Sequence, residues 1–359
     1  MRVFAYYLPQ FHTIPENDEW WGRGFTEWTN VKAAKRLFVG HNQPKVPLNE
    51  YYYNLLNKET VEWQNNLRKQ YRIDGLIYYH YYFKGKLLLE KPAENILKWK
   101  DINQPFFFCW ANHPWIRSWE GKKEIIMPLE YGNEEDWEQH FQYLLPFFHD
   151  SRYEKINNKP MFCIFKSDFL AKERMFEFWD KRCKEEGFAG IYLIETFSGE
   201  LPFSSFAEKL SSKTERVVFR EPSIQTFLWK NNHNSVIDRG FRKIMRALRS
   251  HEVYRKPEVY SGRKLMEQKI IHCENNDLEI PCIWFEWDNT PRHKQRGYVI
   301  LPYEKELFFQ YMEKVKHKDY LFVNAWNEWA EGMILEPTEK ERYRYLEWIK
   351  EWKDSLVSR

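Results

Sequence analysis

Short, nearly continuous apolar runs recur along the chain, and most are followed by a longer stretch with apolar residues at helical spacing. Eight such runs occupy residues 3–8, 75–82, 106–111, 161–165, 191–194, 217–219, 282–285 and 320–325. Continuous hydrophobicity, rather than strict alternation, is typical of strands in a parallel sheet that is covered on both faces. Amphipathic stretches at residues 59–71, 134–149, 172–186 and 304–316 predict intervening helices, and residues 338–352 predict a closing helix.

Eight alternations of strand and helix predict an α/β fold, a (β/α)8 barrel of the TIM type. The runs at 191–194 and 217–219 are short, so a seven-stranded or open sheet remains an alternative. We expect one barrel domain over residues 1–359 with long loops after the strands. A basic helical excursion at about 224–279 interrupts the pattern between the sixth and seventh strands.

Polar residues follow nearly every run, where a barrel places its active site. One such residue alone is an ordinary capping or loop residue, but the repetition favours a polar cleft. We therefore predict that one barrel mouth, walled in part by residues 12–30, gathers His80, Asn112, Glu221, Asp288, Glu328 and Glu331.

The last run leads into the segment NAWNEWAEG, residues 324–332, which holds Glu328 and Glu331 three positions apart. On a helical turn such residues share one face, about 5–6 Å apart at Cβ. Close carboxylates repel, so one tends to keep its proton near neutral pH while the other stays ionised. Cleavage or formation of a glycosidic bond needs such a pair. The flanking Trp326 and Trp329 offer flat apolar faces suited to sugar rings, whereas on an ordinary helix the glutamates would form a solvated face.

Composition narrows the functional classes. Aromatic residues make up 18% of the chain, more than an ordinary core needs, so we expect some to line a groove. The 55 basic and 52 acidic residues leave a net charge of only +3, which disfavours a nucleic-acid partner. No apolar stretch is long enough to span a membrane, and no signal-peptide pattern opens the sequence, so we expect a cytoplasmic protein. The five cysteines have no CxxC or metal-ligand spacing, so we expect reduced thiols and no metal.

Two loops exceed the length of ordinary connections. Residues 12–50 alternate polar residues with tryptophans, as in DEWWG at 18–22 and TEWTN at 26–30, which fits either a sugar-binding wall or a self-packed loop. Residues 238–269 hold ten Lys or Arg against four Asp or Glu. Such a run is either a solvated helix face or a patch for weak contact with phosphate or an anionic membrane surface.

Several long motifs together resemble the WbsX-type proteins of polysaccharide and O-antigen biosynthesis. They are AYYLPQFH at 5–12, IPENDEWWG at 14–22, GFTEWTNV at 24–31, WAN at 110–112, WDNTPR at 287–292 and the block at 326–337. WbsX-type proteins are often called glycosyltransferases and are also described as having a glycoside hydrolase family 99-like domain. That second family comprises retaining endo-α-mannosidases and endo-α-mannanases on a (β/α)8 barrel.

The resemblance implies roles for single residues. Glu328 would be the base that deprotonates the sugar 2-hydroxyl, and Glu331 would protonate the leaving oxygen. Ala330 departs from the family pattern, which has His at that place, and this leaves the leaving-group side open. The motifs and the strand ends together predict substrate contacts at Trp20, Trp21, Glu27, Trp28, His80, Asn112, Trp115, Glu221, Asp288, Arg292, Trp326, Asn327 and Trp329.

Three functions fit the sequence. The first is a cofactor-independent glycoside hydrolase or transglycosylase acting on α-linked, mannose-like oligosaccharides or polysaccharides, lipid-linked or free. The second is a glycosyltransferase that builds a cell-surface polysaccharide, although the chain has no DxD triplet. The third is a barrel that binds glycans without chemistry, which the glutamate pair disfavours.

Overall fold

A parallel barrel forms the centre of the molecule. The computed structural model describes residues 1–119, 122–198, 209–232, 256–273 and 276–357. Neighbouring barrel strands pair in parallel in chain order, and the last strand pairs with the first. The strands are β1 (Arg2–Tyr7), β2 (Gly75–Phe83), β4 (Phe106–Trp110), β8 (Lys159–Ile164), β9 (Tyr192–Phe197), β10 (Thr214–Phe219), β12 (Cys282–Ile283) and β15 (Tyr320–Val323).

The ring closes between the sixth and seventh strands. A parallel bridge joins Val217 of β10 to Glu279, just before β12, and the Val217 amide donates to the Leu278 carbonyl at 2.9 Å. The prediction of eight strands is therefore confirmed, and the seven-stranded and open-sheet alternatives are wrong.

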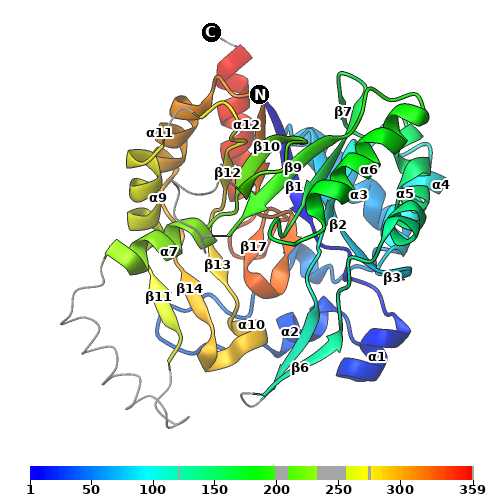
Figure 1. Cartoon of the computed structure of the whole chain (residues 1–359). Helices are drawn as coiled ribbons and strands as arrows, with labels where there is room; N and C mark the ends of the chain where they lie inside the picture. The colour runs from blue at the N-terminus through cyan, green and yellow to red at the C-terminus, as the bar shows by residue number, and fades with distance from the viewer. Residues whose placement is uncertain (120–121, 199–208, 233–255, 274–275, 358–359) are drawn as a thin grey trace.

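Helices surround the barrel (Figure 1). They are α3 (Lys58–Gln70), α4 (Lys91–Lys98), α5 (Glu134–His149), α6 (Lys172–Glu185), α7 (Ser223–Asn232), α9 (Gly262–Ile271), α11 (Lys305–Val315) and α12 (Arg344–Val357). The closing helix begins at Arg344 instead of residue 338, because Thr338 bridges to Pro47 and Arg342 before the helix starts. Its predicted apolar stripe is buried as expected, at Tyr345, Leu346, Ile349 and Trp352.

Aromatic side chains fill the barrel interior. Phe4 contacts Phe107 with ring centroids 5.4 Å apart, and Tyr6 stacks on Tyr79 at 5.6 Å. Many tryptophans are also fully buried, so much of the unusual aromatic content belongs to the core and not to a groove.

Short elements gather at the carboxyl ends of the strands, along the lower edge of Figure 1. The loop after β1 holds α1 (Pro15–Trp21), α2 (Glu27–Ala33) and η1 (Leu48–Glu50), and β3 (Lys86–Leu88) pairs with the end of β2. The remaining mouth elements are the hairpin β5 (Trp115–Trp119) and β6 (Lys122–Met127), the sheet β11 (Glu258–Tyr260), β14 (Tyr298–Ile300) and β13 (Trp287–Asp288), then α10 (Thr290–His293), η5 (Lys294–Arg296), β16 (Asn327–Glu328), η6 (Trp329–Glu331) and β17 (Met333–Ile334).

The predicted excursion at 224–279 is only partly described, because residues 233–255 lie outside the described ranges. Its later part folds back onto the barrel: β11 pairs with β14, and α9 packs on α7 and α11. Lys269 of this segment is buried, and its ammonium donates to Glu221 at 2.8 Å. Contact with a membrane surface through 238–269 thus remains a prediction. In the part of the chain that the structure describes, no helix is long and apolar enough to cross a bilayer.

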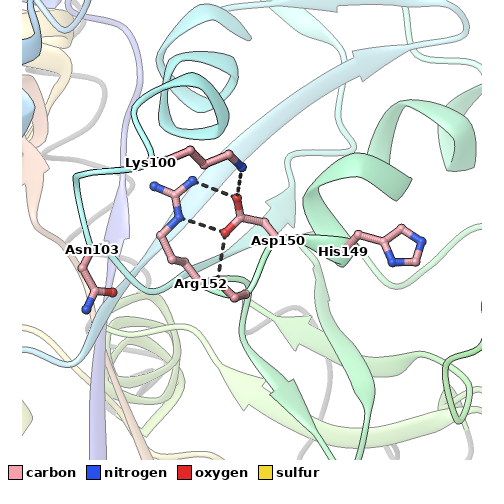
Figure 2. A pocket seen from close by; sticks show the side chains of 6 residues that line it. Lys100, Asn103, His149, Asp150 and Arg152 are labelled. Atoms are coloured by element: carbon pink, nitrogen blue, oxygen red, sulfur yellow. Dashed lines mark hydrogen bonds and ion pairs between the residues drawn. The ribbon is translucent and has the colours of Figure 1, made fainter.

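The opposite end of the barrel holds a cavity of about 580 Å³ lined by Lys100, Asn103, His149, Asp150, Ser151 and Arg152 (Figure 2). The Arg152 guanidinium donates to the carbonyls of Ile96, Trp99 and Ile102 at 2.6–2.9 Å and to both oxygens of Asp150 at 2.8 Å. These groups tie loops before β4 and β8, on the face where barrels carry stabilising rather than catalytic residues. His149 points away from the ion pair in Figure 2.

Candidate active site

The two predicted glutamates lie directly after the last barrel strand. Glu328 ends β16 and Glu331 ends η6, so one turn of backbone carries both. Asn327 fixes the start of this turn: its amide accepts from the Leu8 backbone at 2.7 Å and donates to the Leu8 carbonyl at 3.0 Å. Because Leu8 follows β1, the glutamates are held at the seam between the last and first strands.

Arg292 brings three carboxylates together. From α10, its guanidinium donates to Glu331 at 2.5 Å and to Glu27 at 2.6 Å, and it lies 3.7 Å from Glu328. Glu27 comes from α2 and is fully buried. The loops after the first, seventh and eighth strands thus meet in one charge cluster of Glu27, Arg292, Glu328 and Glu331. The structure therefore brings together four residues that the sequence singled out.

One guanidinium cannot compensate three negative charges. Burial and the neighbouring Glu331 raise the pKa of Glu328 to about 8, although Arg292 acts in the opposite direction. Burial likewise raises the pKa of Glu27 against the effect of Arg292. Glu328 has the longest contact with Arg292, and its buried Oε2 has no hydrogen-bond partner. The free site therefore holds a proton on Glu328 at neutral pH beside a Glu331 that is ion-paired with Arg292.

Two tyrosines that the sequence did not single out face this cluster. Along β2, Tyr79 and Tyr81 point to one side and His80 to the other, because side chains alternate along a strand. Burial raises the pKa of both hydroxyls, and Glu328 is the largest electrostatic influence on each. Neither hydroxyl has a hydrogen-bond partner among the described residues, so both are free to bind a ligand. The alternation of side chains along the predicted strand could have identified both tyrosines as residues of the inward face.

His80 and Glu221 lie away from the cluster, which corrects the prediction that they converge there. His80 packs outward, with its Nε2 2.8 Å from Nε2 of His140 on α5. Glu221 accepts from Lys269 at 2.8 Å and from Gln225 at 3.0 Å in the layer between barrel and helices. Both side chains serve the packing of helices on the barrel.

Asn112 and Asp288 lie at the mouth, but their polar atoms already have partners. Asn112 donates to the Lys166 carbonyl at 2.6 Å and accepts from the Lys166 amide at 2.7 Å, which joins two neighbouring loops. Asp288 accepts from His41 and Gln43, both at 2.8 Å, and from Thr290. Both residues therefore position the mouth, and neither offers a free group to a substrate.

The tryptophans beside the glutamates belong to the core, contrary to the expectation that they pack on sugar rings. Trp326 and Trp329 are 0% and 1% exposed, and their indoles donate to Glu336 at 2.9 and 2.7 Å. Glu336 also accepts from Tyr53 at 2.7 Å and Gln64 at 2.6 Å. Glu336 carries no signal of this role in the sequence, because nothing in its local pattern separates it from an ordinary acidic residue.

The loop after β1 is part core and part wall. Trp28 is buried against Trp329 with ring centroids 5.2 Å apart. Trp20 and Trp21 are only partly buried. The ring centroids of Trp20 and Trp115 lie 5.6 Å apart, and those of Trp115 and Tyr81 lie 5.2 Å apart. The partly exposed indoles of Trp20 and Trp115 thus continue the surface that Tyr81 begins, whereas Trp28 supports it from behind.

The described residues contain no group of three or more His, Cys, Asp or Glu arranged to hold a metal ion. What the cluster offers instead is a protonated carboxyl, a second carboxyl in an ion pair with Arg292, and free tyrosine hydroxyls within one aromatic wall. That set supports proton transfer to and from hydroxyl groups.

The model of the family described as "Glycosyltransferase WbsX" matches residues 3–349. Two curated relatives from Xanthomonas campestris pv. campestris, strains B100 and ATCC 33913, are both described as "Uncharacterized protein WxcX". They are 29% and 28% identical to the chain over 96% of its length. The chain spans 48% of each, so it corresponds to about half of these relatives.

Solved structures resemble the chain in fold. The GH99 endo-alpha-mannosidase from Bacteroides thetaiotaomicron superposes with a TM-score of 0.56 at 12% identity, covering 99% of this chain and 98% of the other. A protein described as "Glycoside hydrolase-like protein" gives a TM-score of 0.60 at 10% identity over 98% and 93%. At such identities the likeness establishes the barrel fold.

Proposed function

Because the chain belongs to the WbsX glycosyltransferase family, we propose that it is a carbohydrate-active enzyme whose catalytic groups are Glu328 and Glu331. The observation that carries the proposal is the charge cluster itself. A buried, protonated Glu328 with one unpartnered oxygen lies beside an ion-paired Glu331 at the carboxyl ends of the barrel strands. The likeness to a GH99 endo-alpha-mannosidase supports α-linked, mannose-like glycans as substrates.

The proposed reaction is a retaining glycosyl transfer in two steps. Glu328, as carboxylate, removes the proton from the sugar 2-hydroxyl while that oxygen attacks the anomeric carbon. The bond from the anomeric carbon to the leaving oxygen breaks, and Glu331 gives its proton to that oxygen. Glu331 then takes a proton from water or a sugar hydroxyl, which attacks the anomeric carbon and opens the anhydro ring. Glu328 returns its proton to the 2-oxygen.

These roles need one proton on the pair, located on Glu331, whereas the free site holds it on Glu328. The two arrangements are tautomers with the same total charge, so they belong to one macroscopic protonation state. A substrate hydroxyl that hydrogen-bonds to the Glu328 carboxyl favours its ionised form, because a hydrogen bond to a charged group stabilises the charge. Binding of the 2-hydroxyl can thereby shift the shared proton to Glu331.

Rate against leaving-group ability tests this division of roles. Glu328→Gln removes the base, so we expect loss on every substrate, typically about 10²–10⁴-fold. Glu331→Gln removes the proton donor, so we expect a similar loss for a sugar leaving group and a largely spared first step for an aryl or fluoride leaving group. The measurement is the single-turnover rate of both variants and wild type on a series of α-mannosides.

Circular dichroism controls for folding, since Glu→Gln preserves shape. Activity equal to wild type in either variant would remove that residue from the mechanism. Equal losses for both variants across the whole series would keep the pair essential and refute the division of roles.

A second candidate function is the transfer of a sugar from an activated donor to a growing polysaccharide, which the description of the family favours. Incubation with a nucleotide sugar plus acceptor, and separately with an α-linked oligosaccharide, distinguishes transfer from hydrolysis by the products. Binding of oligosaccharide with no product in either reaction would identify a glycan-binding barrel instead.

A further inference from the structure

Arg220 and Arg292 both lie at the barrel mouth, but they differ in whether their guanidinium N–H groups already have acceptors. Arg292 is engaged by three carboxylates. Arg220, which directly follows β10, forms no ion pair and no side-chain hydrogen bond with any described residue. Its guanidinium lies 3.4 Å from the centroid of the Phe165 ring. A stacked guanidinium keeps all five N–H donors in the plane of the group available.

The donors of Arg220 are accessible. The residue is only partly buried, and none of its nitrogens is among the enclosed polar atoms that lack a partner. They therefore face open space at the mouth, where water or a ligand can accept from them.

Phe165 joins Arg220 to the neighbouring loops. It follows β8, meets the Tyr79 ring edge-on at 6.0 Å and contacts the His113 ring at 5.0 Å. Burial, together with the charges of Arg220 and Lys166, lowers the pKa of His113 to about 4, so both cations lie within electrostatic reach of the imidazole. Lys166 is exposed, and its ammonium has no partner among the described residues.

The positive charge of this group is not balanced within the mouth. Among the described residues, no carboxylate forms an ion pair with Arg220 or Lys166, and the adjacent Glu221 is committed to Lys269. Glu328 influences Arg220 only at longer range and carries a proton at neutral pH. An unpaired guanidinium beside an aromatic face is a favourable binding element for a carboxylate or phosphate, which its planar fork contacts with two hydrogen bonds.

We propose that Arg220, stacked on Phe165 and flanked by Lys166 and His113, forms a subsite for an anionic group on the glycan substrate. The inference rests on the proposed function, because it places the anion within the same mouth as Glu328 and Glu331. Tyr79 connects the two places, since Glu328 and Arg220 are the two largest electrostatic influences on its hydroxyl. The anion therefore belongs to the reacting sugar or to an adjacent unit.

Both a uronate carboxylate and a sugar phosphate supply this chemistry. The two sources differ in charge and shape but use the same donors. The experiment therefore uses one probe of each kind and a neutral sugar of the same size.

The test is calorimetric binding to the Glu328→Gln protein, in which turnover does not interfere. The probes are methyl α-D-glucuronide, glucose 1-phosphate and methyl α-D-glucoside. We expect at least one anionic probe to bind more tightly than the neutral glucoside. Adding Arg220→Gln should weaken that binding about 10–100-fold, because hydrogen bonds to charged groups are worth that much. Arg220→Lys should give an intermediate loss, since it keeps the charge and loses the fork.

Arg216→Gln is the matched control. Arg216 lies on the same strand, donates to the Glu215 carbonyl at 2.7 Å and lies near the Tyr192 ring, away from Phe165. It should leave binding of every probe unchanged. Circular dichroism confirms folding of each variant, and Arg220→Lys keeps the test valid if Arg220→Gln fails to fold.

If the glucuronide binds more tightly than glucose 1-phosphate and Arg220→Gln removes that binding, the subsite is assigned to uronates. If glucose 1-phosphate binds more tightly and Arg220→Gln removes that binding, the subsite is assigned to sugar phosphates. Equal affinity for anionic and neutral probes, or affinity that Arg220→Gln leaves unchanged, would overturn the proposal. Failure of the proposed function is distinguishable: the wild type would then turn over no glycan while anion binding through Arg220 persisted.

Discussion

A buried carboxyl with an unpartnered oxygen costs a folded protein stability, most of all when the carboxyl is ionised. In the free protein, Glu328 avoids the full cost by keeping its proton, which burial and Glu331 both favour. The pair then carries one shared proton, which acid–base catalysis needs regardless of the residue that holds it.

We therefore predict that kcat/KM falls as pH rises through about 8, the pKa of Glu328. Above that pH the shared proton is lost from the free enzyme and no proton donor remains. The measurement is a pH profile of kcat/KM between pH 6 and 10. A profile that is flat through pH 8, with the fold intact, would contradict a shared proton.

A direct titration complements the kinetics. Glu331 raises the pKa of Glu328, so Glu331→Gln should lower it. Carbon NMR of labelled glutamate side chains would follow the Glu328 carboxyl in both proteins. A pKa unchanged by the substitution would show that the two carboxyls are not coupled.

The role of single residues was predictable from the sequence where the residues lie close together in one motif, as Glu328 and Glu331 do. The local motif predicts that Glu328 and Glu331 lie together, whereas the meeting of Arg292 and Glu27 with this pair comes from the fold. His80 was chosen for its position after an apolar run, but its strand parity points it outward, and Tyr79 occupies the inward place. Trp326 is predicted to present its flat face to a sugar, but its indole donates to the buried carboxyl of Glu336 and stays in the core.

At the scale of elements, η6 depends on one glycine. Gly332 ends the turn with φ +68°, and a Cβ there would lie 2.8 Å from the backbone nitrogen of Asp288. Gly187 also has a positive φ, +88°, but a Cβ there meets no atom within 4 Å. Comparing alanine substitutions at the two positions therefore distinguishes the effect of backbone strain, present at both, from the effect of the close contact with β13, present only at Gly332.

We predict that Gly187→Ala loses about 1–2 kcal/mol of unfolding free energy, from the left-handed backbone alone. Gly332→Ala should lose more than this, together with most activity, because the clash displaces the turn that carries Glu331. Urea denaturation and the turnover rate of both variants check the prediction. Full activity in Gly332→Ala would show that the turn tolerates the displacement.

Long elements were easier to predict from the sequence than short ones, and elements that depend on partners far away in the chain were the hardest to predict. The eight strands and the long helices follow from local periodicity. The mouth elements do not, because they are two to seven residues long and depend on distant partners. β11, for example, forms a sheet only with β14, which lies beyond the seventh strand.

At the scale of the whole molecule, the two ends of the barrel have different roles. The mouth keeps polar groups unpartnered, whereas at the other end Arg152 pairs with Asp150 and ties the loop before β4 to the loop before β8. Burial alone would raise the pKa of Asp150, but hydrogen bonds from Arg152 and Lys100 outweigh it and hold the pKa below its usual range.

We predict that Asp150→Asn destabilises the protein by about 3–5 kcal/mol at pH 7, the cost of leaving a buried partner charge uncompensated. A depressed folded pKa gives stability that is present above the unfolded value of about 3.9 and lost as pH falls through the folded pKa. The difference between wild type and variant should therefore shrink below pH 4. Urea denaturation at pH 7 and pH 3 measures it.

Asp101→Asn is the control, because Asp101 is exposed and pairs with an exposed Lys58. Its effect should be close to zero at both pH values. A difference for Asp150→Asn that stays the same at pH 3 would refute the pH dependence.

The carboxylate of Glu336 has a consequence for synthesis on the ribosome. It accepts hydrogen bonds from the indoles of Trp326 and Trp329, which follow the last strand, and from Tyr53 and Gln64, which come from the first part of the chain. Glu27, also from the first part of the chain, pairs with Arg292 from its last part. A growing chain thus exposes Glu27 long before Arg292 is translated, and the indoles of Trp326 and Trp329 have no acceptor until Glu336 is translated. The proposed active site is therefore complete only when these two distant segments meet, which is also when β1 and β15 pair and close the barrel.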